Sequence, residues 1–341
     1  MRSLLVSLMF CGGAVAAGPD SGHAGGDFHD VIVSVYPALA TNPEMARRLL
    51  TPLTAAAMRE GLARSGARLE DRAVDLAGAR FTIHAPPRAP TGGYGVLVFI
   101  PPWDRAELPP DWRSVLDRAG LVFVTAAGSG NDASTLGRRI PLALAGLSEV
   151  ERRFPVDRTR VYIGGLSGGA RVAMRVALGY PDVFSGAILN AGSDPVGTLD
   201  APLPPKDLAT QLQTRARWIL VTGERDELNA DKDLATVISL RAWCMTAADA
   251  TRLSGKGHEL ADADALAEAI ALVVRPVRPD PGKLAACRAR LDGEVDAEAT
   301  RIRELISKGD ASAARDRLKR LDARYGGWAA NRTAELSAAM K

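Results

Sequence analysis

A glycine-rich turn around Ser167 is the stretch of this chain best suited to chemistry. Residues 165–169 read Gly-Leu-Ser-Gly-Gly, a G-x-S-x-G pattern, and directly follow the strand-like run Arg160–Gly164. A serine on a sharp strand-to-helix turn sits in a strained backbone conformation that exposes its Oγ, and only small neighbours tolerate such a turn. The pattern in this setting predicts that Ser167 is a nucleophile; the alternative is a tight glycine turn with a solvated serine.

A nucleophilic serine requires a base, because a hydroxyl group reacts poorly at neutral pH. Of the four histidines, only His258 lies downstream of the serine, in the glycine loop Ser254–Glu259. We predict that His258 is the base, against the alternative of a surface histidine in a flexible loop.

An acid that orients this histidine is expected between the serine and the histidine in the chain. Asp226 follows the apolar run Trp218–Thr222, so its carboxylate lies at the carboxyl end of a predicted strand. It comes 59 residues after the serine and 32 before the histidine, and each interval has room for about one strand and one helix of a parallel sheet. Glu224 and Glu227 are competing carboxylates in the same loop.

The sequence around the serine resembles a known group of enzymes. The segment Val156–Gly169, with Tyr180–Phe184 after it, looks like the nucleophile region of secreted α/β-hydrolases of the polyhydroxybutyrate depolymerase and feruloyl esterase type. The resemblance covers roughly residues 79 to 274. It implies hydrolysis of carboxylic esters through an acyl-enzyme, with nucleophile, acid and base at Ser167, Asp226 and His258.

The chain departs from this family where the oxyanion is held. Members usually carry His-Gly after an early strand, whereas here the strand Val96–Ile100 runs into Pro101 and Pro102. Proline has no backbone N–H, so the first available donor after the strand is Trp103. We predict a two-donor oxyanion hole made by the N–H groups of Gly168 and Trp103.

The substrate pocket is less well defined by the sequence. The Trp103 ring is expected beside the acyl pocket, with an exposed or core tryptophan as the alternative. Ser129 and Asn131 could line the pocket, although a turn-forming role is the alternative for these two. Fewer than thirty residues separate Asn190 from Trp218, which leaves little room for a large lid. A fairly open site would suit an ester on a polymer or oligomer.

Composition sets outer bounds on the function. The chain has 341 residues, 47% hydrophobic and 24% charged, which is typical of one or two globular domains with a sizeable core. Its formal charge of +3, from 43 basic and 40 acidic residues, gives no electrostatic reason to expect nucleic acid as a partner. No Cys/His cluster has metal-ligand spacing, so neither a metal nor another cofactor is expected.

The first residues resemble a signal peptide. Arg2 precedes the apolar stretch Leu4–Ala17, which ends in small residues suited to signal peptidase. We predict that residues 1–17 are removed and that the protein is periplasmic or secreted. The stretch is short for a membrane span. Cys11 raises a lipoprotein alternative, which the bulky Phe10 before it disfavours.

Three regions follow the signal peptide. Residues 18–78 are expected to form a largely helical extension, with a helical pattern over Asn42–Ser65. Strands and helices then alternate through residues 79–276, which predicts an α/β domain with a mostly parallel, doubly wound sheet. Prolines mark the start of residues 277–341, which are expected to be helical and either to pack on the hydrolase domain or to bind a partner.

Removal of the signal peptide leaves two cysteines, Cys244 and Cys287. An even pair in an exported protein can form a disulfide. The alternative for Cys287 is a buried apolar role, since it shares a helical face with Leu284 and Leu291.

Two classes of function remain open from the sequence. The first is a serine ester hydrolase, with a peptidase or acyltransferase using the same triad as variants within that class. The second is an exported binding protein on a hydrolase scaffold that has lost turnover. The presence of all three triad types in order favours an enzyme.

Overall fold

The computed structural model describes residues 25–340. The expected signal peptide, residues 1–17, and Cys11 lie outside this part of the chain. Within it, every helix is too short or too polar to cross a bilayer.

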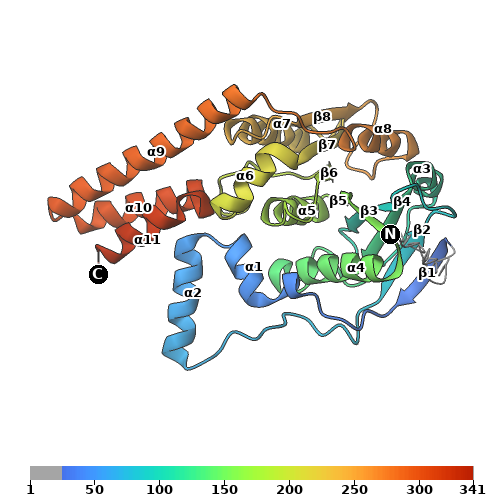
Figure 1. Ribbon diagram of the computed structural model, residues 1–341, viewed down its shortest axis with the longest axis horizontal. Coiled ribbons are helices and arrows are strands. Elements are labelled where there is room, and N and C mark those ends of the chain that lie inside the picture. Colours follow the sequence, from blue (N-terminus) through green and yellow to red (C-terminus); the bar gives the residue numbers. More distant parts are fainter. Residues whose placement is uncertain (1–24, 341) are drawn as a thin grey trace, which may run out of the picture.

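An eight-stranded sheet lies between two layers of helices, in the half of the molecule away from the C-terminus (Figure 1). The strands lie in the order β1-β2-β4-β3-β5-β6-β7-β8. Neighbours from β4 through β8 pair in parallel, whereas β2 is antiparallel to both β1 and β4. The carboxyl ends of the parallel strands therefore share one edge. The strands are β1 (Gly26–Val31), β2 (Phe81–Ala85), β3 (Tyr94–Ile100), β4 (Leu121–Ala126), β5 (Val156–Leu166), β6 (Gly186–Asn190), β7 (Arg217–Gly223) and β8 (Ala248–Leu253).

Helices cover both faces of this sheet, because alternate side chains of each strand point to opposite sides. On β3, Val96 and Val98 belong to the core that packs against α4 and α5, and Leu97 and Phe99 to the core that packs against α3 and α8. The predicted parallel, doubly wound sheet is confirmed. The helices of this domain are α3 (Arg113–Ala119), α4 (Ile140–Arg153), α5 (Gly168–Gly179), α6 (Lys206–Arg215), α7 (Glu227–Ala242) and α8 (Ala263–Val273), with short turns η1 (Ala38–Ala40), η2 (Pro110–Trp112) and η3 (Thr135–Arg139).

The segment before β2 differs from the expectation for residues 18–78. It contains the expected helical region, but as two helices, α1 (Asn42–Leu49) and α2 (Pro52–Ser65). Thr51 separates them, and its side chain accepts the N–H of Thr54 to cap α2. The segment also supplies β1, which pairs with β2 and so extends the sheet to residues upstream of 79. β1 is a polar edge strand with a bulge after Phe28. Its sequence therefore contains no apolar run from which a strand could be predicted.

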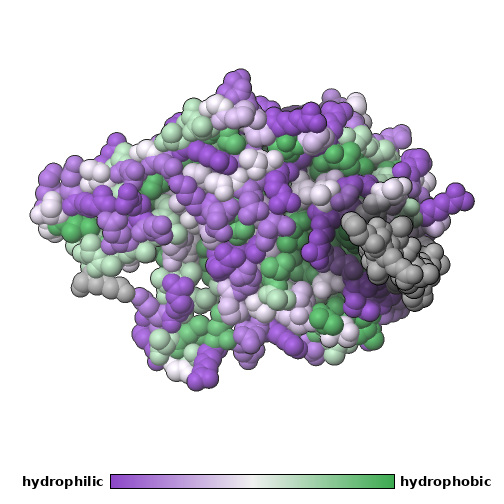
Figure 2. All heavy atoms as spheres, viewed as in Figure 1, coloured by the Kyte–Doolittle hydropathy of each residue, from purple (hydrophilic) through white to green (hydrophobic). Residues whose placement is uncertain are grey.

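The C-terminal region consists of α9 (Pro281–Ser307), α10 (Ala311–Tyr325), the turn η4 (Gly326–Ala329) and α11 (Ala330–Ala338). These helices pack on one another and extend from one end of the molecule, where α2 lies against α10 and α11 (Figure 1). Buried Asp322 of α10 accepts the backbone N–H of Leu53 in α2 at 3.0 Å. Hydrophilic side chains cover most of the visible face of the C-terminal helices (Figure 2).

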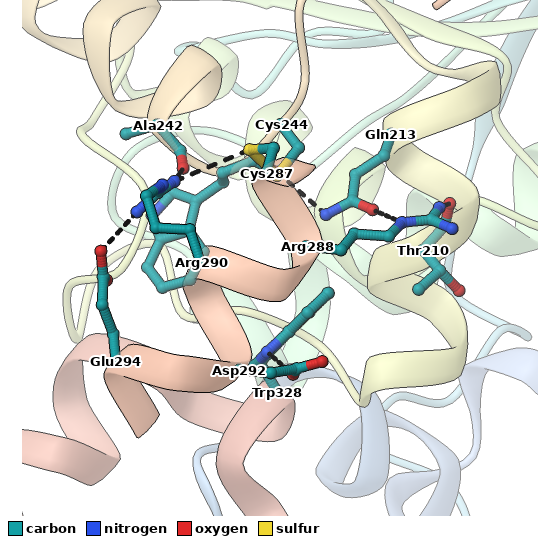
Figure 3. The surroundings of a disulfide bond; sticks show 11 residues. Thr210, Gln213, Ala242, Cys244, Cys287, Arg288, Arg290, Asp292, Glu294 and Trp328 are labelled. Carbon is teal, nitrogen blue, oxygen red and sulfur yellow. Dashed lines mark hydrogen bonds and ion pairs between the residues drawn. A yellow bond between two sulfur atoms is a disulfide. The ribbon is translucent and has the colours of Figure 1, made fainter. Parts of the chain in front are cut away.

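A disulfide joins Cys244, just after α7, to Cys287 in α9 (Figure 3). Their Cα atoms are 6.0 Å apart. Next to this bond, buried Gln213 of α6 donates to the carbonyl oxygen of Trp243 at 3.0 Å and accepts from Arg288 Nε at 2.7 Å. The C-terminal helices are therefore fixed to the domain that contains the sheet both covalently and by hydrogen bonds.

Candidate active site

Ser167 lies at the turn between β5 and α5 in a strained backbone conformation. Its φ is 56° and its ψ is −123°, a backbone conformation that residues other than glycine rarely adopt. A Cβ on Gly169 would lie 2.0 Å from the carbonyl oxygen of Ile100, and one on Gly165 would lie 2.5 Å from the carbonyl carbon of Gly169. Glycine at both positions lets α5 and the end of β3 approach closely enough to form this turn.

The structure brings Ser167, His258 and Asp226 into one hydrogen-bonded line. His258 Nε2 is 2.9 Å from Ser167 Oγ, and its Nδ1 is 2.6 Å from Asp226 Oδ2. A carboxylate can only accept, so the imidazole donates through Nδ1 and leaves Nε2 free to accept the serine proton. The His258 side chain is 46% exposed and that of Asp226 is 9% exposed. The site is therefore open to solvent at the histidine and closed at the acid.

Of the three carboxylates in this loop, Asp226 is the one that contacts the histidine. Glu224 Oε2 instead accepts Ser254 Oγ at 3.2 Å and the N–H of Gly255 at 3.1 Å, so it holds the loop that carries the histidine. Glu227 is exposed in the first turn of α7. Burial favours protonation of Asp226, but hydrogen bonds from the histidine and from Asn229 outweigh it and hold the pKa of Asp226 below its ordinary value. The carboxylate is therefore ionised at neutral pH.

Asn190, the last residue of β6, forms hydrogen bonds to the residues that follow His258. Its buried side chain donates to the carbonyl oxygen of Glu259 at 3.3 Å and accepts the N–H of Ala261 at 2.7 Å. Its backbone oxygen accepts the N–H of Ser167 at 2.8 Å. One residue thus supports the turns on both sides of the Ser167–His258 contact.

The loop after β3 is fixed by hydrogen bonds to its carbonyl groups. Pro101 O accepts Arg139 Nη2 at 3.0 Å, and Pro102 O accepts the N–H of Asn131 at 3.1 Å. The carbonyl carbon of Pro101 lies 3.1 Å from where a Cβ on Gly169 would be, so this loop is packed against the nucleophile turn.

The two predicted oxyanion donors have free N–H groups. Within residues 25–340, neither the N–H of Trp103 nor that of Gly168 has a hydrogen-bond partner. The ring of Trp103 is half-buried with its centroid 6.4 Å from that of Phe99. Asn131 is exposed, and its Oδ1 lies 2.2 Å from where a Cβ on Gly168 would be, whereas Ser129 is buried. Asn131 therefore lies at the nucleophile turn and Ser129 does not line an open surface.

Comparison with known proteins gives limited sequence similarity. No protein-family model matches the chain. A poly(3-hydroxybutyrate) depolymerase from Ralstonia pickettii is 32% identical over 107 residues, a region that spans 27% of this chain and 22% of that protein. Among solved structures, an acetyl xylan esterase from Aspergillus awamori has 14% identity and a TM-score of 0.44, covering 57% of this chain and 94% of its own. A fluorophosphonate-binding serine hydrolase from Staphylococcus aureus has 15% identity and a TM-score of 0.46, covering 59% and 94%.

The strand order decides the architecture. Two antiparallel strands lead into six parallel ones, and the nucleophile turn follows β5 in the middle of the sheet. The fold is that of an α/β-hydrolase. Ser167, Asp226 and His258 lie after β5, β7 and β8, at the shared carboxyl edge of the sheet. Among the described residues, no group of three or more His, Cys, Asp or Glu side chains is placed to hold a metal ion.

Two polar residues of this candidate site were not identified from the sequence. Asn229 donates to Asp226, and Arg171 Nη2 donates to Asn229 Oδ1 at 3.0 Å. Asn229 comes three residues after the acid and Arg171 four residues after the nucleophile. These helical spacings place each on the same helix face as the residue it follows, which was the available signal.

Proposed function

We propose that this protein hydrolyses carboxylic esters through an acyl-enzyme formed on Ser167. The hydrogen-bonded line from Ser167 through His258 to Asp226 carries this proposal. The similarity to a protein named poly(3-hydroxybutyrate) depolymerase supports an ester as the bond that is cleaved.

The reaction follows from the hydrogen bonds of these three residues. Ser167 Oγ attacks the ester carbonyl carbon while His258 Nε2 takes the hydroxyl proton. The negative charge on the carbonyl oxygen is stabilised by the N–H groups of Gly168 and Trp103, and Asp226 stabilises the imidazolium. The intermediate then collapses, the alcohol leaves with the proton from Nε2, and water repeats the sequence to release the acid.

We further propose that the ester belongs to a polymer or oligomer and that the protein acts outside the cytoplasm. The half-exposed histidine supports access by a large substrate. The Cys244–Cys287 disulfide supports an oxidising compartment, as does the signal-like sequence of residues 1–17.

The test compares release of product from short-acyl aryl esters by the wild type and by Ser167→Ala. We expect the wild type to turn over and to be labelled at Ser167 by a fluorophosphonate, and the variant to do neither. Equal rates in the two proteins would contradict the proposal. A wild type that neither turns over nor is labelled would favour the binding protein, and parallel assays with peptides and with acceptor alcohols separate a peptidase and an acyltransferase from a hydrolase.

A further inference from the structure

We infer that Asn229, held in place by Arg171, is a positioning residue that fixes the Asp226 carboxylate in the orientation His258 requires. The inference rests on the proposed function, because it assigns a role within the same triad. Neither residue belongs to the triad or to the oxyanion hole. Asn229 Nδ2 also lies 3.2 Å from His258 Nδ1, but neither residue bonds to Ser167 Oγ or to His258 Nε2.

The Asn229 amide contacts both oxygens of the acid. Its Nδ2 is 2.9 Å from Asp226 Oδ1 and 2.9 Å from Oδ2. Both groups are shielded from solvent, since Asn229 is 7% exposed and the Asp226 side chain 9%. A carboxylate held at both oxygens cannot rotate about its own axis without losing a hydrogen bond. The amide therefore keeps Oδ2 directed at His258 Nδ1, 2.6 Å away.

Arg171 determines which end of the amide faces the acid. A guanidinium can only donate, so Arg171 Nη2 at 3.0 Å must meet the oxygen of Asn229 and not its nitrogen. The nitrogen is then turned toward Asp226. The reversed amide would place its oxygen against a carboxylate and its N–H groups against a guanidinium, and both contacts would be repulsive.

The same pair connects the two helices that carry the nucleophile and the acid. Arg171 lies one turn into α5, and its N–H donates to the carbonyl oxygen of Ser167 at 3.2 Å. Asn229 lies in the first turn of α7, the helix that begins directly after Asp226. Asp194, 3.5 Å from Arg171 Nε, provides the guanidinium with a second partner. This link between α5 and α7 does not pass through the imidazole of His258.

The decisive variant is Asn229→Leu, which removes the amide but keeps a side chain of similar size. We expect kcat to fall by about tenfold to a hundredfold, the range for a misplaced catalytic group, with KM little changed. Arg171→Met should also lower kcat, by a smaller factor than Asn229→Leu.

A matched control is Gln213→Leu. Gln213 is also a buried amide that donates to an oxygen and accepts from an arginine, but it lies beside the disulfide at the base of α9 (Figure 3). We expect this variant to lose stability and to keep the wild-type kcat. A fall in kcat as large as that of Asn229→Leu would show that loss of any buried amide suffices, and would overturn the inference.

A second comparison separates positioning from folding. In an Asp226→Ala background, Asn229→Leu should have no further effect on kcat, because the carboxylate that it positions is gone. An equal fall with and without Asp226 would overturn the inference, as would a folded Asn229→Leu with wild-type kcat. A wild type without esterase activity or fluorophosphonate labelling would instead contradict the proposed function, so the two failures are distinguishable.

Discussion

Ser167 and Asn190 are joined by a backbone hydrogen bond of 2.8 Å, and the side chain of Asn190 holds the residues that follow His258. The end of β6 therefore sets the positions of Ser167 and of the segment that carries His258 together. A change at this one buried residue should disturb both.

We expect Asn190→Leu to lower both stability and kcat. The variant leaves the buried N–H of Ala261 without an acceptor, which costs about 1–3 kcal/mol, and it releases the histidine segment. Urea unfolding and ester hydrolysis measure the two effects. Thr125→Val is the control, because the buried Thr125 hydroxyl has no partner among the described residues. If Asn190→Leu behaved like Thr125→Val in both assays, the bracing role would be wrong.

Adjacent glycines at the nucleophile turn should respond differently to alanine. In Gly169→Ala the new Cβ meets the backbone oxygen of Ile100 at 2.0 Å, so α5 must move and activity should be lost. In Gly168→Ala the three atoms nearest the new Cβ all belong to the exposed side chain of Asn131, which can rotate away. We expect that variant to fold and to retain most of its activity. Labelling rates with a fluorophosphonate compare the two, and equal losses would contradict the prediction.

The oxyanion hole is tested at Trp103. Trp103→Pro removes the N–H donor, and loss of one such donor typically lowers kcat by about 10²- to 10³-fold. Trp103→Phe keeps the N–H and should retain kcat to within a small factor. Steady-state kinetics on one aryl ester would check this pair. Similar kcat values for the two variants would exclude the Trp103 N–H as a donor.

The disulfide should stabilise the protein without affecting catalysis. It closes a separation of 43 residues, for which chain entropy gives about 4 kcal/mol. The 16-residue helix α7, about 24 Å long, lies between Cys244 and the acid. Cys244→Ser/Cys287→Ser should therefore unfold at lower urea concentration and keep the wild-type kcat. An unchanged urea midpoint would contradict the stabilising role of the disulfide. A lost kcat in the folded protein would contradict its independence from catalysis.

Acid should weaken the ion pairs that Glu44 makes within α1. Glu44 accepts hydrogen bonds from Arg47 and from buried Arg48, which also pairs with Asp182 at 2.6 Å. The hydrogen bond from Arg47 is the main cause that lowers the pKa of Glu44 from 4.5 to about 2, against the effect of burial and with help from Arg48. The unfolded chain thus binds the proton first as pH falls.

The stabilisation from Glu44 is therefore complete above about pH 4.5 and is lost as pH falls toward about 2. Glu44→Gln should lower the free energy of unfolding at neutral pH and lose less of it across this interval. Urea unfolding at a series of pH values measures both curves. Curves that run parallel through the interval would contradict the prediction.

The sequence was sufficient for the parts of the structure that carry strong local signals. The long apolar strands predicted the parallel sheet, and the glycines around Ser167 predicted the turn because close approach of helix and strand excludes side chains there. The order of serine, acid and histidine predicted a contact that the structure contains. Their catalytic roles stay a prediction until tested.

Other features depend on tertiary contacts that have no local signature. β1 is held by pairing to β2 and not by its own composition. Glu224 and Asp226 lie two residues apart in one loop, and only the folded loop distinguishes the one that supports the histidine segment from the one that contacts the ring. Arg171 and Asn229 are 58 residues apart in the chain and lie on different helices. Neither helix alone therefore predicts their contact.

The hydrogen bond from Leu53 to Asp322 makes the two helical additions depend on each other. A shortened version that ended before α10 would leave the first turn of α2 without a buried acceptor, although α2 itself was untouched. Conversely, deletion of α2 would leave a buried carboxylate with no backbone donor. Trimming the protein to its hydrolase domain would therefore require the removal of both additions at once.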